Sequence, residues 1–171
     1  MSRCDGLTLI ELLAALGVLA VVLVLAVPAW HGWLIEQRLT TETNRLAGTL
    51  AYARGEAMRR GERVTLCPSP DGLACADSGD YAQGWLLFVD SAATAQGGDG
   101  VERLRVADAS RLEAIQGNLP VQRYISYTPD GRTRLLSGGF QAGTLTLCDS
   151  GRARQLVISA TGRVRSQVSA C

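Results

Sequence analysis

Apolar residues follow three different spacings along this chain of 171 residues. From Leu12 to Trp30, a run of 19 residues, no side chain is charged, and a helix needs about 20 apolar residues to cross a bilayer. From Ile35 to Ala57 the apolar residues recur three and four apart, which is the spacing of one face of an amphipathic helix. After Gly61 the spacing changes to two. The chain therefore predicts a long N-terminal helix followed by a β-rich region.

Eight short segments after Gly61 have the composition of β-strands, and sequences such as "PSPDG", "QGGDG" and "TPDG" separate them as turns. Many short strands behind one long helix predict an α+β fold, with an antiparallel β-sandwich or two-sheet head. The predicted strands are residues 63–67, 84–90, 101–106, 123–128, 133–136, 144–148, 154–159 and 163–168.

Charge is distributed unevenly along the chain. Residues 71–113 contain eight carboxylates and three arginines, whereas residues 121–171 contain seven arginines and two carboxylates. All 17 basic residues are arginine, whose planar guanidinium binds phosphate or carboxylate through two parallel hydrogen bonds. The basic C-terminal part is thus compatible with binding an anionic partner, without requiring one.

The string "GLTLIELL", which begins at Gly6, resembles the leader junction of type IV pilins and type II secretion pseudopilins. The resemblance implies that a prepilin peptidase cuts after Gly6 and methylates the new N-terminus at Leu7. It also implies that Glu11 pairs with the terminal amine of a neighbouring subunit during assembly. Such a protein is held in inner-membrane lipid by a single helix, with its head in the periplasm, before it joins other major and minor pilins in a pilus or pseudopilus.

This resemblance implies a specific organisation of the chain. We expect a cleaved leader at 1–6, a transmembrane or filament-core helix at 7–30, and an amphipathic continuation of that helix at 31–60. The β-rich head is expected at 61–171, on the periplasmic or pilus surface. A long helix before a β-rich head is similar to the type IV pilin group that contains GspH, FimU and FimT.

Four cysteines remain after loss of the leader, and in a head that faces the oxidising periplasm they predict two disulfides. Three pairings are compatible with the sequence. We favour Cys67 with Cys75, which closes a short loop, and Cys148 with Cys171, which holds the C-terminus in place.

The sequence does not favour an enzyme, a metal centre or a cofactor site. His31, the only histidine, lies next to the apolar run, and no CxxC pair or nucleotide-binding motif is present. Calcium binding by Asp71, Asp77 and Asp80 is a weaker interpretation than solvated turns, because their spacing matches no EF-hand loop.

The motif Gly-Arg-x-Arg occurs three times, beginning at Gly131, Gly151 and Gly162. In a strand, side chains two residues apart lie on one face about 6.6 Å from each other, so Arg163 and Arg165 should project together while Val164 enters the core. Arginine pairs of this kind are most often solvated or protect a sheet edge.

Resemblance to FimT, a minor pilin implicated in DNA uptake during natural transformation, favours a functional interpretation of the last copy. It implies that Arg163 and Arg165 bind DNA and that Gly162 gives the turn its backbone conformation. Supporting roles are expected at most for the arginines of the other copies, which are Arg152, Arg154, Arg132 and Arg134. The alternatives are a FimU-like assembly subunit and a GspH-like pseudopilin, neither of which binds DNA.

Overall fold

The computed structural model describes residues 9–171, without the side chains of residues 25–29. The expected cleavage site at Gly6 and Leu7 lies outside the described residues. The long N-terminal helix predicted from the sequence is present as α1 (Leu9–Arg60). The chain divides into two compact units, residues 1–36 and residues 37–171, which are described separately below.

The described part of the first unit is the N-terminal part of α1, from Leu9 to Glu36. Glu11 lies in the first turn of the helix, and the apolar side chains between Leu9 and Val24 are exposed. Among the described residues, no helix has both the length and the apolar character that crossing a membrane requires.

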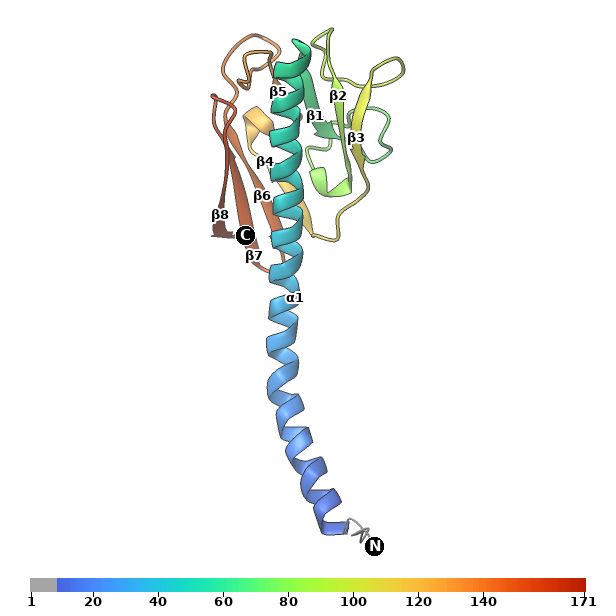
Figure 1. The fold of residues 1–171 in the computed structure, drawn as a ribbon, viewed down its shortest axis with the longest axis vertical. Coiled ribbons are helices and arrows are strands. Elements are labelled where there is room, and N and C mark those ends of the chain that lie inside the picture. The colour runs from blue at the N-terminus through green and yellow to red at the C-terminus, as the bar shows by residue number, and fades with distance from the viewer. Residues whose placement is uncertain (1–8) are drawn as a thin grey trace, which may run out of the picture. The chain divides into compact units, whose positions relative to one another are not determined.

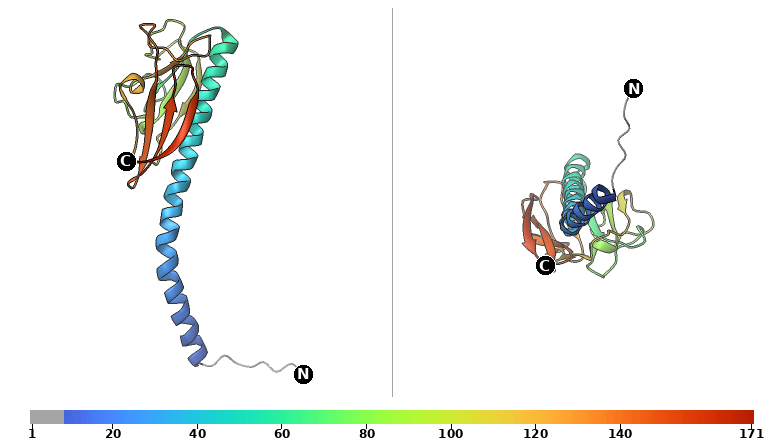
Figure 2. Two further views of the ribbon diagram at one scale, coloured as in Figure 1. Left: turned by 90° about the vertical axis from the view of Figure 1, so that its left-hand side faces the viewer. Right: turned by 90° about the horizontal axis from the view of Figure 1, so that it is seen from below.

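The second unit, residues 37–171, contains the head and the part of α1 that packs against it (Figures 1 and 2). The side chains that α1 contributes to the core lie at the spacing predicted for its apolar face. They are Leu39, Thr43, Leu46, Leu50, Ala53 and Ala57. The helix ends at Arg60, and the N–H of Gly61 donates to the carbonyl of Ala57 at 3.1 Å. Gly61 has a φ of 71°, the left-handed conformation common at helix ends.

Two antiparallel four-stranded sheets form the rest of the head (Figure 1). The first has the order β3-β2-β1-β5, and the second has the order β4-β6-β7-β8, with β8 at an edge. This arrangement confirms the predicted α+β fold. The strands are β1 (Val64–Pro68), β2 (Trp85–Val89), β3 (Arg103–Ala107), β4 (Ala114–Gly117), β5 (Ile125–Tyr127), β6 (Gly143–Asp149), β7 (Arg152–Ile158) and β8 (Val164–Ala170). Short 3-10 helices cover Tyr81–Gln83 and Leu119–Val121.

The prediction of a strand at residues 133–136 is wrong. Thr133 and Arg134 form only isolated bridges, because the chain turns back immediately afterwards. The N–H of Gly138 donates to the carbonyl of Leu135 at 2.9 Å, so the segment is too short to build a ladder.

Strand β4, by contrast, was not predicted. Its sequence "AIQG" has no clear alternation, and tertiary contacts determine its conformation. It pairs with β6 on one side, and on the other the N–H of Ile115 donates to the Asp80 carboxylate at 3.0 Å.

Both pairs of cysteines in the head are joined in the pairing favoured above. Cys67 in β1 is linked to Cys75, with Cα atoms 5.5 Å apart, and Cys148 in β6 is linked to Cys171, with Cα atoms 5.8 Å apart. The second bond crosses from β6 to the residue that follows β8, so it holds the end of the edge strand against its sheet.

The three Gly-Arg-x-Arg copies all begin in hairpin turns. The N–H of Gly131 donates to the carbonyl of Thr128, and the N–H of Gly162 donates to the carbonyl of Ser159, both at 2.8 Å. Gly131 and Gly162 have φ values of 73° and 78°. Each is the last residue of a three-residue hairpin loop, a position that favours glycine, and the following arginine begins the returning segment.

The middle copy uses a shorter loop. Ser150 and Gly151 connect β6 to β7 with φ values of 50° and 77°, which is the pattern of a two-residue turn with positive φ at both positions. Turn geometry therefore explains why glycine precedes arginine in all three copies, without any shared function.

The turns of the first and last copies contact each other. A methyl group on Gly162 would overlap the carbonyl oxygen of Gly131 and would lie 3.1 Å from the ring of Tyr127. Thr133 connects the same two segments, since its hydroxyl donates to the carbonyl of Ser159 at 2.9 Å. Close backbone approach at these two glycines therefore positions the turn that leads into β8.

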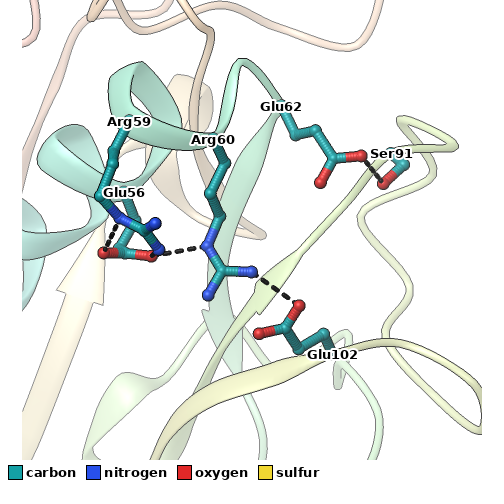
Figure 3. A network of polar contacts seen from close by, with 6 residues as sticks. All are labelled: Glu56, Arg59, Arg60, Glu62, Ser91 and Glu102. Carbon is teal, nitrogen blue, oxygen red and sulfur yellow. Dashed lines mark hydrogen bonds and ion pairs between the residues drawn. The ribbon is translucent and has the colours of Figure 1, made fainter.

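An ion-pair network connects the end of α1 to the segment that leads into β3 (Figure 3). The Glu56 carboxylate accepts hydrogen bonds from the Nε atoms of Arg59 at 3.0 Å and Arg60 at 2.6 Å. Arg60 also donates to Glu102 at 2.6 Å. The hydrogen bonds from Arg59 and Arg60 lower the pKa of Glu56 to about 2.

Because its pKa is lowered on folding, Glu56 stabilises the head above its unfolded pKa near 4.5, and this contribution is lost as the pH falls towards 2. We expect the free energy of unfolding of wild type to fall more steeply between these pH values than that of E56Q. Urea unfolding of residues 37–171 at a series of pH values measures this. E113Q, at an exposed glutamate, is the control and should retain the wild-type pH dependence. Equal steepness in wild type and E56Q would refute the assignment.

Replacing Gly162 by alanine tests the contact between the two turns. G151A serves as the matched control, because Gly151 has a similar φ but open space around it, and it should cost about 1 to 2 kcal/mol from backbone strain alone. G162A adds overlap with the backbone of Gly131, so it should cost about 1 to 3 kcal/mol more than G151A. Equal losses of unfolding free energy in the two variants would contradict the close approach.

Candidate functional site

The candidate site surrounds the turn at the start of β8. Arg163 is the last residue before β8 and Arg165 lies within it, and both side chains are exposed. Within residues 9–171, neither guanidinium forms an ion pair or a side-chain hydrogen bond. Val164, expected in the core, is only half-buried, and it lines a groove beside α1. The last turn thus presents two cations to solvent.

The arginines of the middle copy lie on the other face of the sheet. Arg165 is opposite Val157 in the β7–β8 ladder, whereas Arg154 is opposite Val168. Successive residues of a strand alternate between faces, so Arg154 shares its face with the buried Leu156 rather than with Arg165. The same alternation places Arg152 with Arg154. Arg152 and Arg154 therefore do not lie on the face of Arg165, where the expected supporting role would place them.

The arginines of the first copy have local partners. Asp130 lies 3.7 Å from the Nε of Arg132 and 3.9 Å from an Nη of Arg134. Arg134 also donates to the carbonyl of Gly138 at 3.1 Å and lies over the ring of Phe140. A hydrogen bond from Thr128 is the main reason why the pKa of Asp130 is below its usual value. These arginines are close to the last turn, but their charge is partly neutralised.

The helix contributes a further cation to the site. Arg54 of α1 and Arg163 line a groove of about 430 Å³. The Nε of Arg54 is buried and has no hydrogen-bond partner in the part of the chain that the structure describes. The other residues that line the groove are Ala47, Ala51, Gly55, Met58, Gly162 and Val164.

Arg54 was not among the site residues expected from the sequence. Helical spacing distinguishes it from Arg59 and Arg60, because Glu56 lies three and four residues before those two and pairs with both. No acid lies three or four residues from Arg54, and the described residues offer it no acidic partner. Arg54 instead lies close to the buried Tyr127. Burial raises the pKa of the Tyr127 hydroxyl, and the positive charge of Arg54 opposes part of that rise. A site with Arg54, Arg163 and Arg165 can hold anionic groups through charge-assisted hydrogen bonds.

The geometry offers no comparable arrangement for a metal ion. No group of three or more histidine, cysteine, aspartate or glutamate side chains suited to a metal occurs among residues 9–171. Asp71 and Asp80 accept hydrogen bonds from backbone amides of their own turns, and Asp77 pairs with Arg123 at 3.3 Å. These contacts are those of turn and surface residues.

Comparisons with known proteins agree with this fold. Residues 1–27 match the model of the prokaryotic N-terminal methylation motif, and residues 42–162 match the model of type II transport protein GspH. The GspH match ends at Gly162, so Arg163 and Arg165 lie immediately beyond it.

One curated relative is the pilin-like protein PilA1 of Thermus thermophilus, with 33% identity over 174 residues, 94% of this chain and 96% of the relative. Two crystal structures of the type IV minor pilin FimU of Pseudomonas aeruginosa share the fold. One has 21% identity and a TM-score of 0.61 over 80% of this chain and 94% of FimU. The other has 20% identity and a TM-score of 0.57 over 78% of this chain and 97% of FimU. The chain therefore belongs to the GspH, FimT and FimU family of type IV minor pilins and pseudopilins.

Proposed function

We propose that this chain is a FimT-like minor pilin whose head binds DNA and supports DNA uptake in natural transformation. The observation that carries the proposal is the pair of exposed arginines at the β8 turn, Arg163 and Arg165, which have no acidic partner among the described residues. Arg54 of α1, which is half-buried and also has no acidic partner among the described residues, adds a third cation that lines the same groove as Arg163.

The proposed contacts are with phosphates. A guanidinium binds a phosphate through two parallel hydrogen bonds, and Arg163 and Arg165 lie at a hairpin turn and on an edge strand rather than on a recognition helix. Phosphate contacts position a protein on DNA but do not read its sequence. Binding should therefore have no sequence preference and should weaken steeply with added salt.

The proposal includes the route by which the head reaches DNA. Prepilin peptidase would cleave after Gly6 and methylate Leu7, and residues 7–30 would hold the chain in inner-membrane lipid with the head in the periplasm. Glu11 would then pair with a neighbouring pilin during assembly. Several heads in one pilus would raise the avidity of individually weak sites.

A pilus-assembly or type II secretion role without DNA binding is the second candidate. The fold likeness to FimU and the match to GspH favour it. Deletion of the gene separates the two functions, since an assembly factor is needed for pili or secretion, whereas a dedicated DNA receptor is needed only for uptake.

Replacing both exposed arginines tests the proposed site. In a titration of fluorescent duplex DNA against the chain in mild detergent, R163Q/R165Q should bind more weakly than wild type at low salt. The slope of log affinity against log salt is negative, and each phosphate that an arginine no longer neutralises makes it shallower by about 0.9. The slope of the double variant should therefore be shallower by about 1.8.

The matched control for this test removes the same charge elsewhere. R103Q/R123Q replaces two arginines that pair with Asp99 and Asp77, so it should keep nearly the wild-type affinity and slope. The site assignment is wrong if the two double variants behave alike, or if wild type fails to bind DNA at low salt.

A further inference from the structure

A row of polar side chains crosses the second sheet from strand to strand. In the registers of the β4–β6, β6–β7 and β7–β8 ladders, Gln116 is opposite Thr146, Thr146 is opposite Gln155, and Gln155 is opposite Gln167. Directly opposed residues lie on the same face of a sheet. The four side chains therefore form one line at right angles to the strands, called the polar row below.

The polar row lies on the face turned away from the core. The neighbouring residues in sequence, Ile115, Leu147 and Leu156, are buried on the other face. Gln116 and Gln167 are exposed, while Thr146 and Gln155 are half-buried. Strands in a sheet lie about 4.8 Å apart, so three steps give the row a length of about 14 Å.

The Nε2 of Gln167 donates to the Oε1 of Gln155 at 2.8 Å. This bond orders the two glutamines at the edge of the sheet. It leaves the amide N–H groups of Gln155, and the remaining amide hydrogen of Gln167, as donors that are not used in this contact.

Within the four strands of this sheet, the only charged side chain near the polar row on this face is Arg165. The row next to the polar row is Thr144, Val157 and Arg165, and the row on its other side is Ala114, Cys148, Ala153 and Ser169. Neither row contains a carboxylate or an aromatic ring. Asp149, the acid of β6, is buried and belongs to the opposite face by alternation. The polar row is thus continuous with Arg165 at its β8 end. At its β4 end Gln116 is opposite Asp80, whose carboxylate accepts hydrogen bonds from the N–H groups of Ala82 and Ile115.

We propose that the polar row binds the sugar–phosphate backbone of DNA as an uncharged extension of the arginine site. Glutamine and threonine side chains donate to phosphate and sugar oxygens in protein–DNA interfaces. About 14 Å corresponds to the axial rise of about four nucleotides in one strand of a duplex. A backbone that meets Arg165 can therefore continue across β7, β6 and β4. This inference rests on the proposed function, because it requires DNA to be bound at Arg165.

Uncharged contacts have a signature that distinguishes them from the arginines. Phosphate contacts by arginine release counterions and so determine the salt slope, whereas amide contacts release none. Q155A/Q167A should therefore lower affinity for duplex DNA about five- to tenfold with the salt slope unchanged. R163Q/R165Q should lower affinity and slope together.

The experiment titrates fluorescent duplex DNA against the full chain in mild detergent at several salt concentrations. Q37A/Q96A is the matched control, since both glutamines are exposed and lie outside this sheet, and it should bind like wild type. Q167E, a single isosteric change on the exposed edge strand, keeps the test valid if Q155A/Q167A does not fold. Q167E should bind more than tenfold more weakly than wild type, because it places a carboxylate on the proposed track.

Different results overturn the two proposals. If R163Q/R165Q weakens binding but Q155A/Q167A and Q167E bind like wild type, the polar row is not part of the site, whereas the proposed function stands. If wild type binds no DNA at low salt, the proposed function fails and this inference fails with it. Binding of neutral dextran that is abolished in Q155A/Q167A, with DNA binding unchanged, would overturn the inference in favour of a carbohydrate surface.

Discussion

The packing of one apolar helix face organises the head. Leu39, Leu46, Leu50, Ala53 and Ala57 are completely buried in the unit formed by residues 37–171. Each leucine that is removed from water in this way contributes about 1.5 to 3 kcal/mol, so this face is a major source of stability for a domain of this size. The same helix segment supplies Arg54, which faces the turn before β8. Core packing thus determines which cation of α1 reaches the candidate site.

Two glycine turns then place the remaining arginines. Because Gly131 and Gly162 approach each other without side chains, the turn before β8 lies directly against the turn after β5. The Cys148–Cys171 disulfide holds the other end of β8. An edge strand constrained at both ends keeps Arg165 in a defined register with β7, so the face on which it lies is fixed. This register separates it from Arg152 and Arg154, which share the same motif but lie on the opposite face.

The main elements could be predicted from the sequence because local signals specify them. The spacing from Leu39 to Ala57 identified the buried helix face, and alternating apolar residues with turn signals identified seven of the eight strands. Strand β4 was missed because its four residues have no local pattern and depend on β6 and Asp80 for their conformation. Residues 133–136 have the composition of a strand, but the following turn leaves them no partner over that length.

The candidate site was only partly predictable for the same physical reason. The exposure of Arg163 and Arg165 follows from the turn and the strand period. The positions of Arg54, Arg152 and the polar row depend on strand register and on how α1 packs against the head, and a single sequence does not contain that information. The pairing of Glu56 with Arg59 and Arg60, by contrast, follows from helical spacing. The most direct test of the whole account is to map bound duplex DNA on residues 37–171 by amide chemical-shift changes. The account predicts shifts at 162–167, at Arg54 and along Gln155 and Thr146, whereas shifts confined to the face of Arg152 and Arg154 would contradict it.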